Sequence, residues 1–598
     1  MQTVSTAWKD NQRRTMVGES FIEVSFDITD PAALADATAT DNGSAYISDT
    51  SGVTSEVDKN TSSYVTLEQN MWLLDGSRES IPVAANHNEG YVGDTLSDKN
   101  GLFSDKVPTI TVNFSRVHTN PIPAVTVKWG TAYNEYAEDF VVTAFNGNTV
   151  VVSQDVVGNK SVQSVVEMDI VNFDRITLTV LKWCLPNRRA RVEELFIGMN
   201  KVYSKSDLLG YSHSQTADPL STSLPKAEIS FTVSNMDNAY NPYNVNGLSR
   251  YLMERQEIKT RYGYRLDGDK IEWIKGGTFY LSEWGSAQNG TRAEFTARDV
   301  LELMSAVYYE GQYSESGESL YDLALDVLNK ANLPLNNDGS EKWYIDESLK
   351  DVYTVAPLPV DTLANCLQLI ANAGQCAFYQ DRNGTLHIEP LWIDVGDYDI
   401  SLRNSYSKSD MKQSKPVKQV NVAVYQYFED EKTSELYKGS IENSGTVETW
   451  VVYSNPAKNV SATVSGGSLI SAAYYTNACK LIVSSEGNAT VTVTGTVLKE
   501  SKSDIVPSNS QSGEIVSIDN PLITSRERAT LIADWIYSYL SNRTVLSSNW
   551  RADPRLDALD LVNNENDYGF NGVLMTMVGY EYNGAFRGKS EGRVILNG

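Results

Sequence analysis

Few residues in this chain could carry acid–base or nucleophilic chemistry. The sequence has four histidines, namely His87, His118, His213 and His387. None lies in an HExxH motif or beside a serine or cysteine nucleophile signature, so metalloprotease and triad chemistry have no support. His387 falls in an alternating strand pattern and His213 in the polar segment YSHSQ. We expect His387 to be a surface or packed residue and His213 to lie in a polar loop.

Paired carboxylates are the other source of chemistry to consider. A glycosidase needs two carboxyl groups roughly 5 to 9 Å apart across a cleft. The chain has 76 acidic residues, and their positions do not single out a pair. Solvated surface carboxylates are the commoner explanation. We therefore assign no catalytic residue and expect a protein that is not an enzyme.

Cofactor and metal motifs are also missing from the sequence. The four cysteines are far apart with no CxxC pair, which favours buried free thiols: Cys184, Cys366, Cys376 and Cys479. The segments DGDK (267–270) and NNENDYG (563–569) lack EF-hand spacing and are more typical of turns. No phosphate loop or dinucleotide-binding GxGxxG motif occurs. We expect no bound cofactor and no metal.

Three tryptophans are candidate glycan contacts. Trp72, Trp129 and Trp183 could stack on sugar rings as apolar platforms. Core packing is the commoner fate of such rings. If they do bind glycans, each site would be weak, and several copies together would raise the affinity.

The charge of the chain excludes a protein that grips nucleic acid. The formal net charge is −26, with 76 acidic against 50 basic residues. This charge serves solubility, or it repels phosphates in a conduit through which DNA slides, and both explanations stay open. The start, MQTVSTAWKDNQRR, lacks the apolar core of a secretory signal, and no stretch reaches the roughly 18 to 20 apolar residues that span a bilayer. We expect the chain to be made and folded in the cytoplasm.

The elements that must position these residues are mainly strands. Segments such as FIEVSFDIT (21–29) and KAEISFTVSN (226–235) alternate apolar and polar residues. Two hairpins are expected at the Asn-Gly dipeptides 146–147 and 383–384. At 598 residues the chain is long enough for several domains.

Three helices interrupt the strands. Ser319 with Asp322 predicts a helix start, and a second helix fits 362–373, capped by Asp361 and stopped by Gly374. A capping box of Thr524 and Glu527 predicts a third helix. The apolar face expected for that helix consists of Ala529, Ile532, Ala533, Ile536 and Leu540.

The order of these segments resembles the central hub family of phage tails. The segments are ARDVLELM with Asp299, the two-helix spacer, the NGTLHIEP hairpin, NPLITSRERATLIADWIYSYLSNR and WRADPRLDALDLV. The chain is similar to baseplate or tail-tip hubs of tailed phages and phage-tail-like particles, in particular to the N-terminal part of the tail-associated lysin type. The match covers 1–29, 203–440 and 507–598, and Asn520–Leu561 is its best piece. The block 30–202, with WLLDGS at 72–77, loosely resembles galactose-binding-like modules.

The resemblance implies a mainly β fold class: two related β-barrel hub domains with β-sandwich insertions and a small helical spacer. The first barrel would comprise 1–29 plus 203–310, and the second 376–440 plus 507–598. The inserted galactose-binding-like sandwich would span 30–202, the helical spacer 311–375 and a small β-subdomain 441–506.

The function that the resemblance implies is structural. Three copies would form a ring in the virion tail that joins the tail tube to the distal tip and lines part of the channel. The partners would be further copies of the chain, a distal tail or tail-tube protein, a tape-measure protein, a tip or fibre protein, and host surface glycans if the insertion adheres; DNA would pass without specific binding. Two alternatives remain: a carbohydrate-binding adhesin or receptor-binding tail protein, and a tail-associated cell-wall hydrolase.

Overall fold

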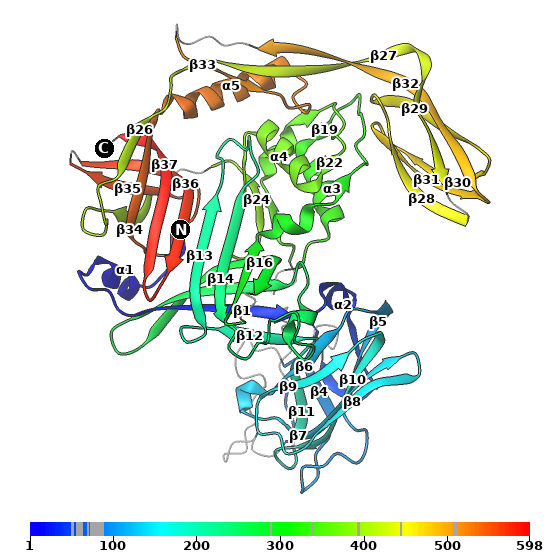
Figure 1. Ribbon diagram of the computed structural model, residues 1–598, viewed down its shortest axis with the longest axis vertical. Coiled ribbons are helices and arrows are strands. Elements are labelled where there is room, and N and C mark those ends of the chain that lie inside the picture. Colours follow the sequence, from blue (N-terminus) through cyan, green and yellow to red (C-terminus); the bar gives the residue numbers. More distant parts are fainter. Residues whose placement is uncertain are drawn as a thin grey trace.

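The molecule consists mainly of β-sheets, with five α-helices among the residues that the structure describes (Figure 1). The computed structural model describes residues 1–48, 53–54, 64–68, 71, 89–286, 290–335, 340–391, 395–442, 445–505, 512–567 and 569–597. The predicted mainly β class is confirmed.

A thirteen-stranded sheet forms the centre of the molecule. Its main path runs β12 (Met199–Tyr203), β1 (Ser20–Ile28), β15 (Glu257–Arg265), β16 (Ile271–Ser286), β17 (Arg292–Arg298), β14 (Lys226–Ser234), β13 (Leu208–Thr216), β36 (Gly569–Tyr582), β37 (Phe586–Asn597), β34 (Thr544–Arg551) and β26 (Asp410–Gln413). β35 (Leu561–Asn566) pairs with β36 off this path, and β25 (Val395–Ile400) pairs with β35. The sheet thus joins the N-terminal and C-terminal parts of the chain.

The junction between the two parts is the antiparallel pair β13–β36, in register from Tyr211 opposite Tyr582 to Thr216 opposite Met577. One apolar core lies under both parts and includes Phe26, Phe231 and Phe586. No sheet closes into a ring among the described residues. The strands expected for two separate barrels therefore lie in one open sheet.

The segment between β1 and β12 forms a β-sandwich, at the lower right of Figure 1. One sheet has the order β2 (Thr38–Asp41), β5 (Thr109–His118), β10 (Phe173–Trp183), β7 (Ala137–Asn146) and β8 (Thr149–Val156). The other has the order β3 (Ala45–Ser48), β4 (Tyr91–Leu96), β11 (Arg189–Phe196), β6 (Ile122–Trp129) and β9 (Gln163–Ile170). Both sheets share one core.

The two ends of the sandwich lie side by side at the central sheet. The chain leaves β1 through Asp30, whose side chain accepts the Ala32 N–H at 3.0 Å and begins α2 (Pro31–Asp36). It returns as β12, where Met199 pairs with Ile28. A segment inserted in this way leaves the sheet that carries it continuous.

The helical region has α3 (Leu320–Ala331) and α4 (Leu363–Gly374) at its centre, with the 3₁₀-helices η4 (Val300–Met304) and η5 (Glu347–Asp351). Short strands border it: β18 (Val307–Tyr308) with β22 (Asp361–Thr362), β19 (Glu318–Ser319) with β21 (Tyr353–Thr354), and β20 (Trp343–Ile345), β24 (Leu386–Glu389) and β23 (Ala377–Gln380). The predicted Ser319 cap is confirmed, since its hydroxyl accepts the Asp322 N–H at 3.0 Å. The predicted hairpin at 383–384 is β23–β24.

Three predicted helix ends were wrong by one residue. α4 is capped by Thr362, and the left-handed residue that ends it is Gln375 (φ 58°) rather than Gly374. α5 (Arg526–Ser541) is capped by Ser525, whose hydroxyl accepts the Arg528 N–H at 3.1 Å, and not by Thr524. At the two helix starts, the cap is the hydroxyl that lies three residues before a free backbone N–H.

A long two-stranded ribbon carries a small lobe at the upper right of Figure 1. β27 (Val417–Glu442) pairs along its length with β32 (Asn488–Ile505), in a sheet that also contains β29 (Ala457–Ser465) and β33 (Glu514–Ile518). β28 (Gly445–Val452), β31 (Ala478–Ser485) and β30 (Ser468–Tyr474) make the second sheet of the lobe. α5 packs on β27 and shares the core of the helical region through Ile532 and Ile536. The ribbon therefore connects the lobe to the body.

Candidate functional site

Two of the three candidate glycan contacts are core residues. Trp129 and Trp183 are both 0% exposed. Their indole N–H groups donate to Ser164 Oγ and Glu135 Oε2, each at 2.9 Å, and their ring centroids lie 6.0 Å apart in an edge-to-face arrangement. Neither ring can therefore lie against a sugar, which corrects the glycan-contact interpretation. Trp72 lies outside the described residues.

A buried ion cluster lies at one end of the sandwich. Arg191, 1% exposed, forms a two-pronged pair with Glu68, at 2.7 Å and 2.6 Å. Arg188 is paired with Glu135. The Tyr64 hydroxyl donates to Glu89 at 2.5 Å. The run RRAR at 188–191 is the sequence signal that could have indicated this cluster, since arginine is rarely buried without a partner.

The electrostatics of this cluster are those of a structural pair. Burial acts to raise the pKa of Glu68, but its bonds to Arg191 outweigh burial and hold the pKa below the ordinary value. Both partners therefore stay charged at neutral pH. A buried pair of this kind fixes the arrangement of the segments that carry it.

Two of the histidines lie in buried surroundings. The His118 ring nitrogen Nε2 lies 2.9 Å from Asp36 Oδ2, where the sandwich meets α2. His213 on β13 is 2% exposed, and its Nδ1 lies 2.9 Å from the Tyr262 hydroxyl. Burial, together with the charge of Arg382, lowers the pKa of His213 to about 3, so the ring is neutral at pH 7. His213 is thus a buried strand residue and does not lie in the polar loop expected from the segment YSHSQ. His87 lies outside the described residues.

His387 lines a cavity of about 370 Å³ between the β23–β24 hairpin, the start of β14 and residues 557–560. Its ring stacks on Tyr379, with centroids 4.9 Å apart, and its nitrogens lie 3.7 Å from Asp381 Oδ2 and 3.4 Å from Glu389 Oε1. Burial alone would lower the pKa of His387, but the two carboxylates outweigh it and raise the pKa to about 9. The ring is a cation at neutral pH and cannot act as a general base there.

Asp299 faces the same cavity, and its carboxylate is hydrogen-bonded to the backbone. Its two oxygens accept the N–H groups of Ala227 and Leu301, so that it caps η4. Burial raises the pKa of Asp299 to about 7, although these hydrogen bonds oppose the shift. These hydrogen bonds fix the position of the Asp299 carboxyl group in the cavity wall.

Other ingredients of a catalytic or metal site are missing from the part of the chain that the structure describes. No group of three or more His, Cys, Asp or Glu residues could hold a metal ion there. Burial raises the pKa of Cys366 and of Cys376 to about 12, so neither is a thiolate at neutral pH.

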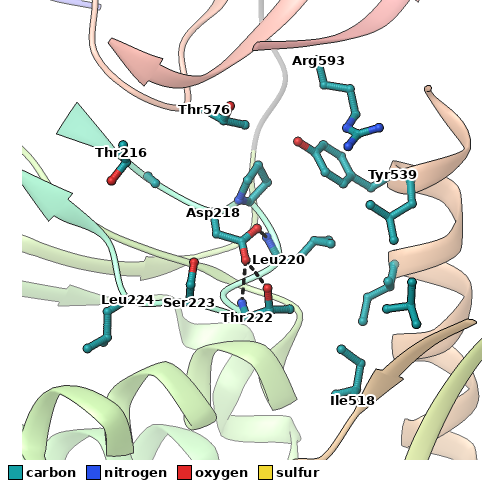
Figure 2. A pocket seen from close by; sticks show the side chains of 15 residues that line it. Thr216, Asp218, Leu220, Thr222, Ser223, Leu224, Ile518, Tyr539, Thr576 and Arg593 are labelled. Carbon is teal, nitrogen blue, oxygen red and sulfur yellow. Dashed lines mark hydrogen bonds between the residues drawn. The ribbon is translucent and has the colours of Figure 1, made fainter. Parts of the chain in front are cut away.

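A second cleft of about 450 Å³ lies between the 216–224 loop and α5 (Figure 2). Asp218 holds the loop by accepting the Thr222 N–H at 2.8 Å. On the opposite wall, the guanidinium carbon of Arg593 lies 5.0 Å from the centre of the Tyr539 ring. The remaining lining is mixed apolar and hydroxyl.

A rigid loop between β14 and β15 displays apolar side chains. The N–H groups of Asn238, Asn241, Asn244 and Gly247 each donate to the carbonyl three residues earlier, at 2.9 to 3.2 Å, so that four turns follow one another. This turn ladder (235–247) leaves Met236, Tyr243 and Val245 exposed by 76%, 91% and 74%. Large apolar groups held on a fixed backbone are suited to contact with another protein.

Tail proteins are among the solved structures to which this chain is similar. The 43 kDa tail protein of prophage MuSo2 from Shewanella oneidensis is 9% identical, with a TM-score of 0.37 over 66% of this chain and 95% of that chain. The tail protein from Neisseria meningitidis MC58 is 9% identical, with a TM-score of 0.37 over 66% of this chain and 94% of that chain. The prophage tail protein gp18 from Listeria monocytogenes EGD-e is 8% identical, with a TM-score of 0.35 over 67% of this chain and 92% of that chain.

No protein-family model matches the sequence, and no curated protein matches it. Among the described residues, no helix combines the length and the apolar character needed to cross a membrane.

Proposed function

We propose that this chain is a structural hub of a phage tail tip or baseplate and that it acts by assembly and without catalysis. Three copies form a ring that joins the tail tube to the distal tip and lines part of the channel for DNA and the tape-measure protein. The observation that carries the proposal is the composition of the central sheet. Seven of its thirteen strands come from residues 20–298 and six from residues 395–597.

Two comparable halves of the central sheet in one chain suit a ring whose two faces contact partners of different symmetry. Three copies with two comparable halves present six units on one face while keeping true threefold symmetry. Such a ring can contact a sixfold tube on one side and a threefold tip on the other. The sequence resemblance to tail hubs supports the same arrangement.

A ring that transmits force also needs halves that do not move against each other. The shared core and the β13–β36 pairing support a single rigid body. The net charge of −26 suits a channel through which DNA slides without binding. The partners in this proposal are further copies of the chain, a distal tail or tail-tube protein, the tape-measure protein and a tip or fibre protein, all in the virion tail.

The sandwich and the lobe extend from the body, and in this proposal they brace neighbouring tail proteins. A glycan-binding role has lost two of its three candidate residues, since Trp129 and Trp183 are buried. A cell-wall hydrolase would need two carboxyl groups that face a substrate across a cleft, and Asp299 in the cavity beside His387 is bound by two backbone N–H groups. Neither alternative is favoured by a specific contact.

The first test is the mass and symmetry of the purified full chain, by light scattering and negative-stain class averages at micromolar concentration. A threefold ring with a central opening is the expected result. A monomer at every concentration, also in the presence of a tail-tube protein, would overturn the proposal. Binding of glycans by that monomer would instead favour the adhesin.

A further inference from the structure

The outer strand of the sandwich, β8, has an unused edge. It pairs with β7 on one side, and no strand follows it on the other side among the described residues. Of the eight residues of β8, six are exposed and two are half-buried, without strict alternation. Most of the residues of β8 are thus exposed, and its outer edge pairs with no strand among the described residues.

The sequence of β8 lacks the usual protection of an edge strand. It reads TVVVSQDV, with no proline or lysine and with Asp155 as its one charged residue. Val150 and Val151 are exposed by 53% and 38%, and Val157, which follows the strand, by 80%. β9, an edge strand of the other sheet, instead alternates exposed and buried residues and carries Glu167 and Asp169.

The edge is held in a fixed shape. β7, its partner, is anchored in the core by Phe140 and Val142, both 0% exposed. The turn between the strands is held by Asp174, which accepts the Gly147 N–H at 2.8 Å, and by Arg175, which donates to the Gly147 carbonyl at 2.9 Å. An incoming strand would find its hydrogen-bonding groups already in place, which lowers the entropy lost on binding.

We propose that β8 binds an extended, uncharged segment of a neighbouring tail protein, which adds to the sheet as a sixth strand. The proposal rests on the proposed function only for the source of that segment. A free-standing pair of proteins uses about 20 to 30 residues a side, and β8 offers eight. A second copy is disfavoured because each copy carries a net charge of −26. A segment of a protein already held in the same assembly gains from its high effective concentration.

The test uses the full chain and a labelled synthetic peptide of alternating threonine and valine with a lysine at each end. Fluorescence anisotropy should give saturable binding, and hydrogen exchange at 149–156 should slow when the peptide is bound. The same peptide with alternate backbone nitrogens methylated keeps its side chains but loses donors, and its affinity should fall at least tenfold.

Two variants locate the binding. Val150→Lys should weaken binding at least tenfold, whereas Ile470→Lys, at a residue 61% exposed on β30, should leave it unchanged. No saturable binding at millimolar peptide, or equal binding of the methylated peptide, overturns the proposal. Association of the chain with itself that Val150→Lys abolishes also overturns it, because the occupant is then a second copy. If the chain binds the peptide but forms no ring, the proposal for β8 stands and the proposed hub function is rejected.

Discussion

Arg382 Nε donates to Asp557 Oδ1 at 2.6 Å, across 175 residues of sequence. The other two nitrogens of this guanidinium donate to the carbonyls of Lys275 at 2.8 Å and Leu556 at 2.9 Å. The Arg382 side chain is 1% exposed. One buried side chain therefore joins the β15–β16 hairpin, the β23–β24 hairpin and the segment before β35.

Replacing Arg382 should destabilise the body of the molecule strongly. Arg382→Met leaves Asp557 and two carbonyls without their donor, which should lower the free energy of unfolding by about 3 to 5 kcal/mol. Urea unfolding followed by tryptophan fluorescence measures the loss. The matched control is Lys350→Met, in an exposed pair with Glu347, where a much smaller change is expected. Equal effects of the two substitutions would contradict a joining role for Arg382.

The cation at His387 should make stability fall at alkaline pH. Its folded-state pKa of about 9 lies above the ordinary value of 6.5, so its contribution is complete below pH 6.5 and is lost as the pH rises through 9. The melting temperature of the wild type should therefore fall towards that of His387→Gln between pH 7 and 10. Differential scanning fluorimetry of both proteins measures this. A constant difference across the range would show that the carboxylates Asp381 and Glu389 do not hold a proton on the ring.

Local features could be predicted from the sequence because they depend on neighbours along the chain. Alternation indicated β1 and β14, and the Ser319 cap indicated the start of α3. Helix ends were wrong by one residue where two candidate caps stood side by side, as at Thr524 and Ser525. The choice between them depends on backbone geometry that neither residue type determines.

Long-range features could not be predicted in this way. The pairing of β13 with β36 joins the N-terminal half of the chain to its C-terminal end, and alternation in each strand says nothing about its partner. The burial of Trp129 and Trp183 likewise follows from two sheets meeting face to face. Arg191 and Glu68 were missed because their pairing crosses 123 residues of sequence.

Replacing Trp183 should affect stability through its buried hydrogen bond. Trp183→Phe removes the donor to Glu135, which is 3% exposed, and should cost about 1 to 3 kcal/mol. Thermal unfolding of the full chain checks this. Trp284→Phe, at a ring 40% exposed, is the control and should change stability by about 0.5 kcal/mol or less. A loss no larger than that of the control would contradict the core role of Trp183.

Tyr243 should matter for assembly and not for folding. Its side chain is 91% exposed on the turn ladder, so Tyr243→Ser removes apolar contact area without opening a cavity. We expect an unchanged melting temperature and at least a tenfold weaker association in light scattering across a concentration series. Tyr353→Ser, at a residue 62% exposed on β21, is the matched control and should associate as the wild type does. Equal association of both variants would exclude the turn ladder as a contact. A lower melting temperature for Tyr243→Ser would show that the Tyr243 side chain stabilises the loop itself.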